Sequence, residues 1–316
     1  MQAAVVNVLG QPPHYQEFPE PVPGDGEVVI TVRAAGLHPI VKARASGAHY
    51  SSMGELPAVP GVDGVGTLED GSRVFFASAR PPWGTMAERS VADRSRCIPL
   101  PDGVGDIEAA AIANPGMSAW LSIKDRAALA QGETVLIMGA TGVAGRLAIH
   151  FARYLGAKRI IAVGRNVDAL ESESVDRIIG LNQPEDAIRA AFAAEVANGI
   201  DVIIDYLWGR PTELLLEALA KGFKATSTKS TRLVEVGESA GKTIALPGAV
   251  LRSIDLTLMG SGFGSVPLDR IFRAIPELFA MAAAGELKVD VEPVPLADVE
   301  SAWTRVEKGR RIVFTP

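Results

Sequence analysis

The stretch "GATGVAG", residues 139 to 145, follows the apolar run "TVLIM" (134–138) and precedes "RLAIHFARYLGA". The apolar run predicts a short buried strand, and the segment after the turn predicts an amphipathic helix. A glycine turn between a strand and a helix presents unpaired backbone N–H groups and the positive end of the helix dipole. We therefore predict that the turn binds the pyrophosphate of a dinucleotide. The alternative is a tight turn that binds nothing.

The spacing of the turn follows the G-x-G-x-x-G pattern of dinucleotide sites, except that its first position is Ala140. Gly142 is expected to let the backbone approach the pyrophosphate, and Gly145 to let the helix pack closely on the strand. The predicted cofactor contacts in this turn are Ala140, Thr141, Gly142, Val143, Ala144 and Gly145.

The end of the next predicted strand, "RIIAVG" (159–164), indicates which dinucleotide binds. NAD sites place an acidic residue near this point to accept the ribose hydroxyls. This chain has Gly164, Arg165 and Asn166 instead. A guanidinium binds a phosphate dianion that a carboxylate would repel, so we predict NADP(H), with these three residues in the site. The alternative for Arg165 is an arginine exposed to solvent.

The region around the turn alternates apolar strands with helices, which predicts a doubly wound parallel sheet of the Rossmann type over 116–262. Its first helix is predicted in 117–132, and its last strand in "DLTLMGSG" (255–262). Residues 1–115 are rich in Gly and Pro and contain β-like runs, so they predict a small β domain. The tail, 263–316, ends in a predicted strand and is expected to return to that first domain. The fold class is α/β.

The composition excludes several classes of protein. The chain has 316 residues and a net charge of −6, so no broad basic face for nucleic acid is expected. Cys97 is the single cysteine, which excludes a disulfide within the chain. No apolar run approaches the roughly 20 residues that a membrane span needs. The N-terminal segment lacks the pattern of a secretory signal. We expect a cytoplasmic protein that acts on a small molecule and does not bind a membrane.

Several motifs, taken in order along the chain, resemble the medium-chain dehydrogenase/reductase superfamily and its zinc-independent quinone oxidoreductase branch. The motifs are "GLHP" (36–39), "PGVDGVG" (60–66), "GTMAE" (84–88), "GATGVAG" (139–145), "TRLVEVG" (231–237) and a terminal "RRIVF".

The resemblance implies a GroES-like catalytic domain, a Rossmann domain, and hydride transfer from NADPH to a quinone or an α,β-unsaturated carbonyl. It also implies a homodimer formed through an edge strand, for which "DLTLMGSG" is the candidate. Two alternatives stay open: reduction of an imine or another activated double bond, and a catalytically inactive nucleotide-binding protein of the same fold.

The resemblance argues against a catalytic metal. In the zinc alcohol dehydrogenases of the superfamily, a Cys falls where His38 stands, a His where Val62 stands, and a Cys near Asn114. Valine cannot bind zinc, and asparagine is a poor zinc ligand, whereas a catalytic zinc needs three protein ligands. We therefore expect no metal site.

Proton donors are sought among the polar residues of the first domain, because the reduced substrate needs a proton after hydride arrives. Tyr50 and His49 in "ASGAHYSSMG" (45–54), together with His38, are the candidates, and a residue without a role is the alternative for each. Trp83 and Trp208 follow predicted strands and are candidates for the substrate pocket, or else for packing. The resemblance places Asn114, Ser118, Gly237, Gly260 and Phe263 along the cofactor.

Overall fold

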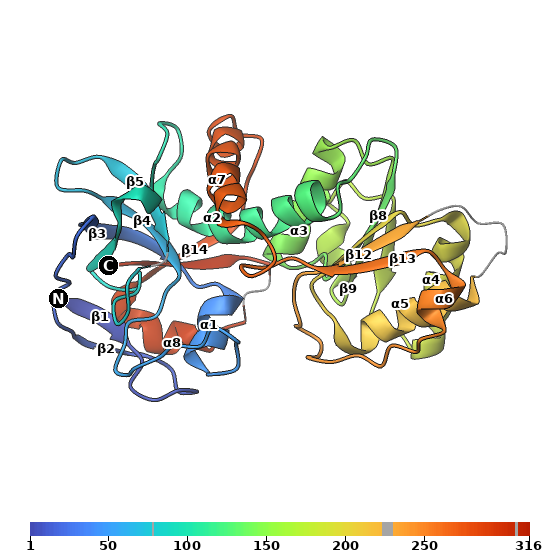
Figure 1. Ribbon diagram of the computed structural model, residues 1–316, viewed down its shortest axis with the longest axis horizontal. Helices are drawn as coiled ribbons and strands as arrows, with labels where there is room; N and C mark the ends of the chain where they lie inside the picture. Colours follow the sequence, from blue (N-terminus) through green and yellow to red (C-terminus); the bar gives the residue numbers. More distant parts are fainter. Residues whose placement is uncertain (78, 223–229, 307–308) are drawn as a thin grey trace. The chain divides into compact units, whose positions relative to one another are not determined.

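The computed structural model describes residues 1–77, 79–222, 230–306 and 309–316 (Figure 1). Contacts within the chain divide it into two units. Unit 1 contains Met1–Pro115 and Ile275–Pro316, and unit 2 contains Gly116–Ala274.

Unit 2 is built on a six-stranded sheet in the order β10-β9-β8-β11-β12-β13. Every neighbouring pair is parallel. Numbered by their appearance in the chain, the strands follow the 3-2-1-4-5-6 order of a doubly wound sheet, which confirms the predicted fold class. The strands are β8 (Thr134–Met138), β9 (Arg159–Gly164), β10 (Arg177–Gly180), β11 (Val202–Asp205), β12 (Thr231–Glu235) and β13 (Leu256–Gly260).

Helices cover both faces of this sheet, with α3 (Val143–Tyr154) on one face and α4 (Glu185–Asn198) and α5 (Gly209–Lys221) on the other (Figure 1). In α3, Val143, Leu147 and Phe151 are buried at intervals of one turn, so the helix presents an apolar stripe to the sheet. The short helices of unit 2 are η3 (Val167–Leu170) and α6 (Val250–Ser253).

Unit 1 holds a seven-stranded sheet in the order β14-β15-β3-β4-β5-β7, with β6 also paired to β3, and a separate β1-β2 pair. Its strands are β1 (Gln2–Val5), β2 (His14–Glu17), β3 (Glu27–Gly36), β4 (Asp63–Thr67), β5 (Arg73–Ala77), β6 (Arg89–Asp93), β7 (Cys97–Pro99), β14 (Val291–Pro295) and β15 (Arg311–Thr315). Its short helices are α1 (Pro39–Ala45), η1 (Arg94–Arg96), η4 (Leu296–Asp298) and α8 (Val299–Trp303).

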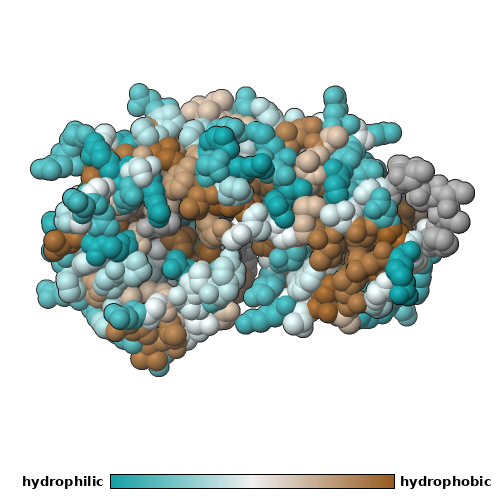
Figure 2. Space-filling view, in the orientation of Figure 1, coloured by the Kyte–Doolittle hydropathy of each residue, from teal (hydrophilic) through white to brown (hydrophobic). Residues whose placement is uncertain are grey.

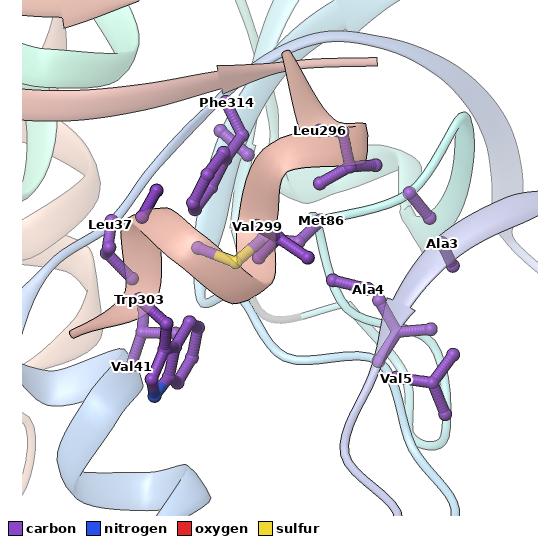
Figure 3. Packing of buried hydrophobic residues seen from close by; sticks show 14 of the residues in the cluster. Ala3, Ala4, Val5, Leu37, Val41, Met86, Leu296, Val299, Trp303 and Phe314 are labelled. Atoms are coloured by element: carbon purple, nitrogen blue, oxygen red, sulfur yellow. The ribbon is translucent and has the colours of Figure 1, made fainter. Parts of the chain in front are cut away.

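The C-terminal tail belongs to unit 1, where β15 pairs antiparallel with β3. One face of this region is closed by α8, whose Val299 and Trp303 pack near Leu37, Val41 and Phe314 (Figure 3). These residues come from both ends of the chain, so the core of unit 1 forms only when the tail is in place.

The first predicted helix of unit 2 begins earlier than we expected. The helix α2 covers Asp106–Leu121 and continues as a π-helix over Ser122–Arg126, whereas the sequence indicated a start at Met117. The alanine-rich segment before Pro115 favours a helix, and Asp106 and Glu108 in the first turn suit its dipole. A proline inside a helix removes one N–H donor, and here the tertiary context tolerates that loss.

The chain passes from one unit to the other inside helices. The first passage lies in α2, and the second lies in α7 (Leu268–Ala283). Within the described residues, no helix has both the length and the apolar character required to cross a bilayer.

Candidate functional site

The glycine turn after β8 is fixed to the end of β9 by backbone hydrogen bonds. The N–H groups of Gly139 and Ala140 both donate to the carbonyl of Val163, each at 2.9 Å. Gly139 has φ +84°, a left-handed conformation that favours glycine. The chain then turns back, with the Gly142 N–H donating to the Gly139 carbonyl at 3.1 Å. The turn is therefore a defined structure rather than a loose connection.

Two glycines near this turn are required by close packing. A Cβ atom on Gly145 would lie 2.3 Å from the Gly139 carbonyl oxygen, and one on Gly164 would lie 2.6 Å from Cγ2 of Thr141. Gly142 differs, because the nearest atom to a Cβ there is 3.5 Å away and the residue is exposed. The first two glycines let helix and strand ends approach, and Gly142 leaves the outer surface of the turn open.

The start of α3 has free hydrogen-bond donors. Gly142 is the N-cap residue, and no side chain caps the helix. The first helical hydrogen bond runs from the Arg146 N–H to the Gly142 carbonyl, at 2.9 Å. Among the described residues, no acceptor is found for the N–H groups of Val143, Ala144 and Gly145. Unpaired N–H groups at the positive end of a twelve-residue helix suit an anion. The pyrophosphate of a dinucleotide fits this arrangement.

The end of β9 carries an exposed arginine and no acid. Arg165 and Asn166 are both exposed immediately after the buried Gly164. In the part of the chain that the structure describes, no carboxylate forms an ion pair with Arg165. The guanidinium is therefore available to an anion, and no acidic residue occupies the position that would hold ribose hydroxyls.

Most of the other predicted cofactor residues lie at the same edge of the unit 2 sheet, because all its strands are parallel. Gly237 follows β12, and its N–H donates to the Asp205 carbonyl at 3.2 Å. Gly260 ends β13 opposite Glu235 of β12, and Phe263 is exposed three residues later. Asn114 and Ser118 are instead half-buried on successive turns of α2.

Asp205, at the end of β11, has a fully buried carboxylate that accepts three hydrogen bonds. The donors are the N–H groups of Leu207 at 2.8 Å and Trp208 at 3.0 Å and the hydroxyl of Thr212 at 2.5 Å. Burial raises the pKa of this carboxyl, and the three donors oppose that rise. The neighbouring Glu235 also has a raised pKa, because it is partly buried and lies near Asp205 and Glu238.

Trp208 adopts an unusual backbone conformation, with φ +53° and ψ −162°. The residue directly precedes α5, and its side chain is half-buried against the core of unit 2. Together with the glycine turn, it lies at the carboxyl ends of adjacent strands, since β8 pairs with β11.

In unit 1 the structure brings His38 close to Asp63. The Nε2 atom of His38 lies 3.0 Å from Oδ1 of Asp63, and both side chains are buried. The ring lies against Gly36, where a Cβ atom would be 2.4 Å from Nε2. Neither Nε2, at this distance, nor the buried Nδ1 has a hydrogen-bond partner among the described residues, and Nδ1 lacks even a contact with a carboxylate. A buried imidazole nitrogen without a partner is rare, so this atom requires an explanation.

The other two predicted proton donors lie on the loop after α1. Tyr50 is 78% exposed, and its ring stacks on that of His49 with centroids 4.0 Å apart. His49 Nδ1 lies 2.9 Å from the hydroxyl oxygen of Ser51. The predicted pocket residue Trp83 donates its indole N–H to the Pro19 carbonyl at 3.0 Å, and the guanidinium of Arg80 lies over its ring. These contacts fix Trp83 within unit 1.

No cluster of three or more His, Cys, Asp or Glu side chains that could hold a metal is found among the described residues. The His38–Asp63 pair supplies two such groups. Val62 precedes Asp63 and offers no third ligand.

Asp63 and Asp205 are the residues that sequence reasoning missed. Asp63 lies in the motif "PGVDGVG" (60–66), and its partner His38 comes from a different part of the chain. Asp205 had a local signal, since an aspartate at a strand end commonly accepts hydrogen bonds from the backbone two residues on.

Comparison with known proteins gives relatives that cover the whole chain. A probable NADPH-dependent quinone reductase of Emericella nidulans is 27% identical, and the alignment covers all of both chains. The solved structure of a quinone oxidoreductase from Thermus thermophilus, also described in complex with NADPH, is 27% identical, with a TM-score of 0.78 and full coverage of both chains.

A spectinabilin polyketide synthase system protein of Streptomyces orinoci is 30% identical over 86% of this chain, but the match spans only 12% of that much longer protein. No family model matches the chain.

Proposed function

This chain belongs to the medium-chain dehydrogenase/reductase superfamily, and on that premise we propose that it is an oxidoreductase that transfers hydride from NADPH to a quinone. In this proposal unit 2 binds the nucleotide, and unit 1 provides the residues that handle the proton. Bound NADPH would supply the hydride, and the chain's own residues would bind the cofactor, orient it and handle the proton.

One observation supports the proposal most directly. The N–H groups of Val143, Ala144 and Gly145 are unpaired among the described residues, and Gly142, which precedes them, is exposed. These donors would bind the pyrophosphate without any side-chain charge. The exposed Arg165 at the end of β9, with no acid beside it, would bind the 2′-phosphate that distinguishes NADPH from NADH. The remaining contacts are proposed for Gly164, Asn166, Asn114, Ser118, Gly237, Gly260 and Phe263.

The test is a titration of the protein with NADPH and with NADH, followed by fluorescence, in the wild type and in Arg165→Ala. We expect the variant to lose about tenfold in NADPH affinity and to keep its NADH affinity, because a charge-assisted contact is removed. Lys158→Ala is the matched control, since it removes an exposed cation just before the opposite end of the same strand. Equal NADPH and NADH affinities in the wild type would contradict the role of Arg165.

For the proton that follows the hydride, we propose His38, held by Asp63, with Tyr50 and His49 as the other donors. His38 fits because it is a titratable group whose Nδ1 has no partner among the described residues, whereas Tyr50 is largely exposed. In a steady-state assay with NADPH and a naphthoquinone, His38→Asn should lower kcat by about a hundredfold, and Tyr50→Phe should change it little. The reverse ranking would assign the proton to Tyr50.

We also propose a homodimer formed through β13. This strand is at the edge of the unit 2 sheet, so one side of its backbone is unpaired. Leu251 and Leu258 are exposed nearby, and Figure 2 shows hydrophobic residues gathered in the part of unit 2 where β13 and α6 lie. Sedimentation of a monomer at micromolar concentration would contradict the proposal. The expectation of a cytoplasmic protein rests on the single Cys97 and stays a prediction.

A further inference from the structure

Trp208 is held in a backbone conformation that a tryptophan rarely adopts. Its φ of +53° and ψ of −162° lie near a region that is populated almost only by glycine. Among the described residues, Ala128, with φ +47°, is the other non-glycine residue with a positive φ. Gly209, which is free to adopt such a conformation, follows directly. A conformation this costly persists only where the surrounding structure enforces it.

The Asp205 carboxylate is the main group that enforces this conformation. Its Oδ1 accepts the N–H groups of both Leu207 and Trp208, and its Oδ2 accepts the Thr212 hydroxyl. The carboxylate therefore connects the end of β11 to the loop and to the first turn of α5. Since the side chain is completely buried, water does not compete for these donors.

The loop after β12 also forms hydrogen bonds with the segment around Trp208. Ala240 N–H donates to the Leu207 carbonyl at 2.7 Å, and the Ser239 hydroxyl donates to the Tyr206 carbonyl at 2.8 Å. Gly209 lies so close to this loop that a Cβ atom on it would be 2.7 Å from the Ala240 carbonyl oxygen. Residues 206–209 are thus fixed at both ends.

This fixed loop borders the glycine turn. A Cβ atom on Gly139 would lie 3.1 Å from Cδ2 of Leu207 and 3.2 Å from Cβ of Tyr206. The two segments follow β8 and β11, the pair of strands between which the strand order reverses. Ligands of doubly wound sheets bind outside the carboxyl ends of the strands at that point.

The indole of Trp208 is suited to a flat ligand. The side chain is half-buried. The backbone N–H of Trp208 donates to Asp205, but no described residue accepts a hydrogen bond from the indole Nε1–H. Aromatic side chains bind nucleotide bases by stacking, and a ring that is already fixed loses little entropy on binding. A backbone held under strain to present an aromatic side chain points to a function for that side chain.

We propose that Asp205 is a positioning residue, which holds Trp208 in its left-handed conformation so that the indole stacks on an aromatic ring of the bound dinucleotide. The proposal rests on the proposed function, since it takes the ligand to be NADPH. The ring is either the adenine or the nicotinamide, which share the flat aromatic face that the indole recognises.

The test measures the affinity of wild type, Trp208→Phe and Trp208→Leu for NADPH, adenosine 2′,5′-bisphosphate and reduced nicotinamide mononucleotide by calorimetry. We expect Trp208→Leu to lower the affinity for NADPH by about tenfold, and the affinity for one of the two fragments by a similar factor. The affected fragment identifies the ring. Trp208→Phe, which keeps a flat ring, should retain most of the affinity. Trp120→Phe, in the core of unit 2, is the control and should leave all three affinities unchanged.

Thermal unfolding of the same proteins separates stacking from packing. Trp208→Gly relieves the backbone strain, so we expect its melting temperature to fall less than that of Trp208→Leu, while its NADPH affinity falls at least as much. The proposal is overturned if Trp208→Leu binds all three ligands like the wild type. It is also overturned if both fragments weaken equally. A wild type that binds no nucleotide would instead refute the proposed function.

A double-mutant cycle tests whether Asp205 acts through Trp208. Asp205→Asn should weaken the binding of NADPH in the wild-type background. It should have little further effect on that binding in the Trp208→Leu background, because the stacking surface is already lost. Equal losses in both backgrounds would show that Asp205 only supports the fold.

Discussion

The carboxylates of Asp205 and Asp63 are both buried, one in each unit, but their surroundings differ. Asp205 accepts hydrogen bonds from Leu207, Trp208 and Thr212, all within seven residues of it. Asp63 has one of its oxygens 3.0 Å from His38, a residue at the start of a different element, and neither ring nitrogen of that histidine makes a hydrogen bond among the described residues.

The difference shows two uses of a buried acid. A carboxylate that accepts bonds from its own loop fixes the backbone and has little capacity left for chemistry. A carboxylate beside a histidine orients a group that can still exchange a proton. This contrast fits our proposal that the edge of the unit 2 sheet holds the ligand and that His38 of unit 1 handles the proton.

The largest effect is expected from removing Asp205, and Asp63 provides the comparison. Asp205→Ala leaves two N–H groups and one hydroxyl buried without an acceptor, so it should lower the free energy of unfolding by about 3 kcal/mol. Asp63→Ala should cost about 1 kcal/mol, because a single contact is lost. Urea unfolding followed by circular dichroism measures both. Similar losses would remove the distinction between the two acids.

A methyl group added to a glycine in each region should give a smaller effect. In Gly145→Ala the added methyl group meets backbone atoms of Gly139 and Ala140, which cannot move away. The substitution should therefore lower the free energy of unfolding by about 2 kcal/mol and weaken the binding of NADPH. Gly36→Ala meets the His38 ring first, so it should displace that ring and lower kcat while NADPH affinity stays unchanged. Thermal unfolding and nucleotide titration of both variants test this. Loss of NADPH affinity in Gly36→Ala would contradict the assignment of roles.

The smallest effect is expected from substituting Glu185, an acid that is exposed whereas Asp205 is buried. Hydrogen bonds from Arg210 lower the pKa of Glu185 to about 2, so its contribution to stability is present above pH 4.5 and is lost as the pH falls toward 2. Burial raises the pKa of Asp205, so its ionisation opposes folding, and stability falls as the pH rises through its titration.

Glu185→Gln should therefore reduce the loss of stability between pH 4.5 and pH 2, and only slightly, because solvent screens exposed pairs. Melting temperatures measured across this range test the prediction. Glu171→Gln, at an exposed glutamate outside the Arg210 network, is the control. If both variants respond alike, the Arg210 contact contributes nothing.

Local sequence patterns were sufficient for most of unit 2. The run "TVLIM", the turn "GATGVAG" and the alternation of strands and helices predicted the parallel sheet and the position of the turn, because each depends on residues close in sequence. The pairing of β15 with β3 joins residues far apart in the sequence. The start of α2 was placed eleven residues too late, because the helix includes Pro115, a residue that local preference disfavours inside a helix and that the tertiary structure tolerates.

The sequence by itself determined the glycine turn between a strand and a helix, the lack of an acid after β9 and the resemblance to a family of reductases. Only the tertiary structure decided that His38 meets Asp63 and that Asp205 holds Trp208 in a left-handed conformation. The physical reason is that the first set depends on spacing along one strand and one helix. A buried contact depends on which side chains the packing brings together, and spacing along the chain does not specify that.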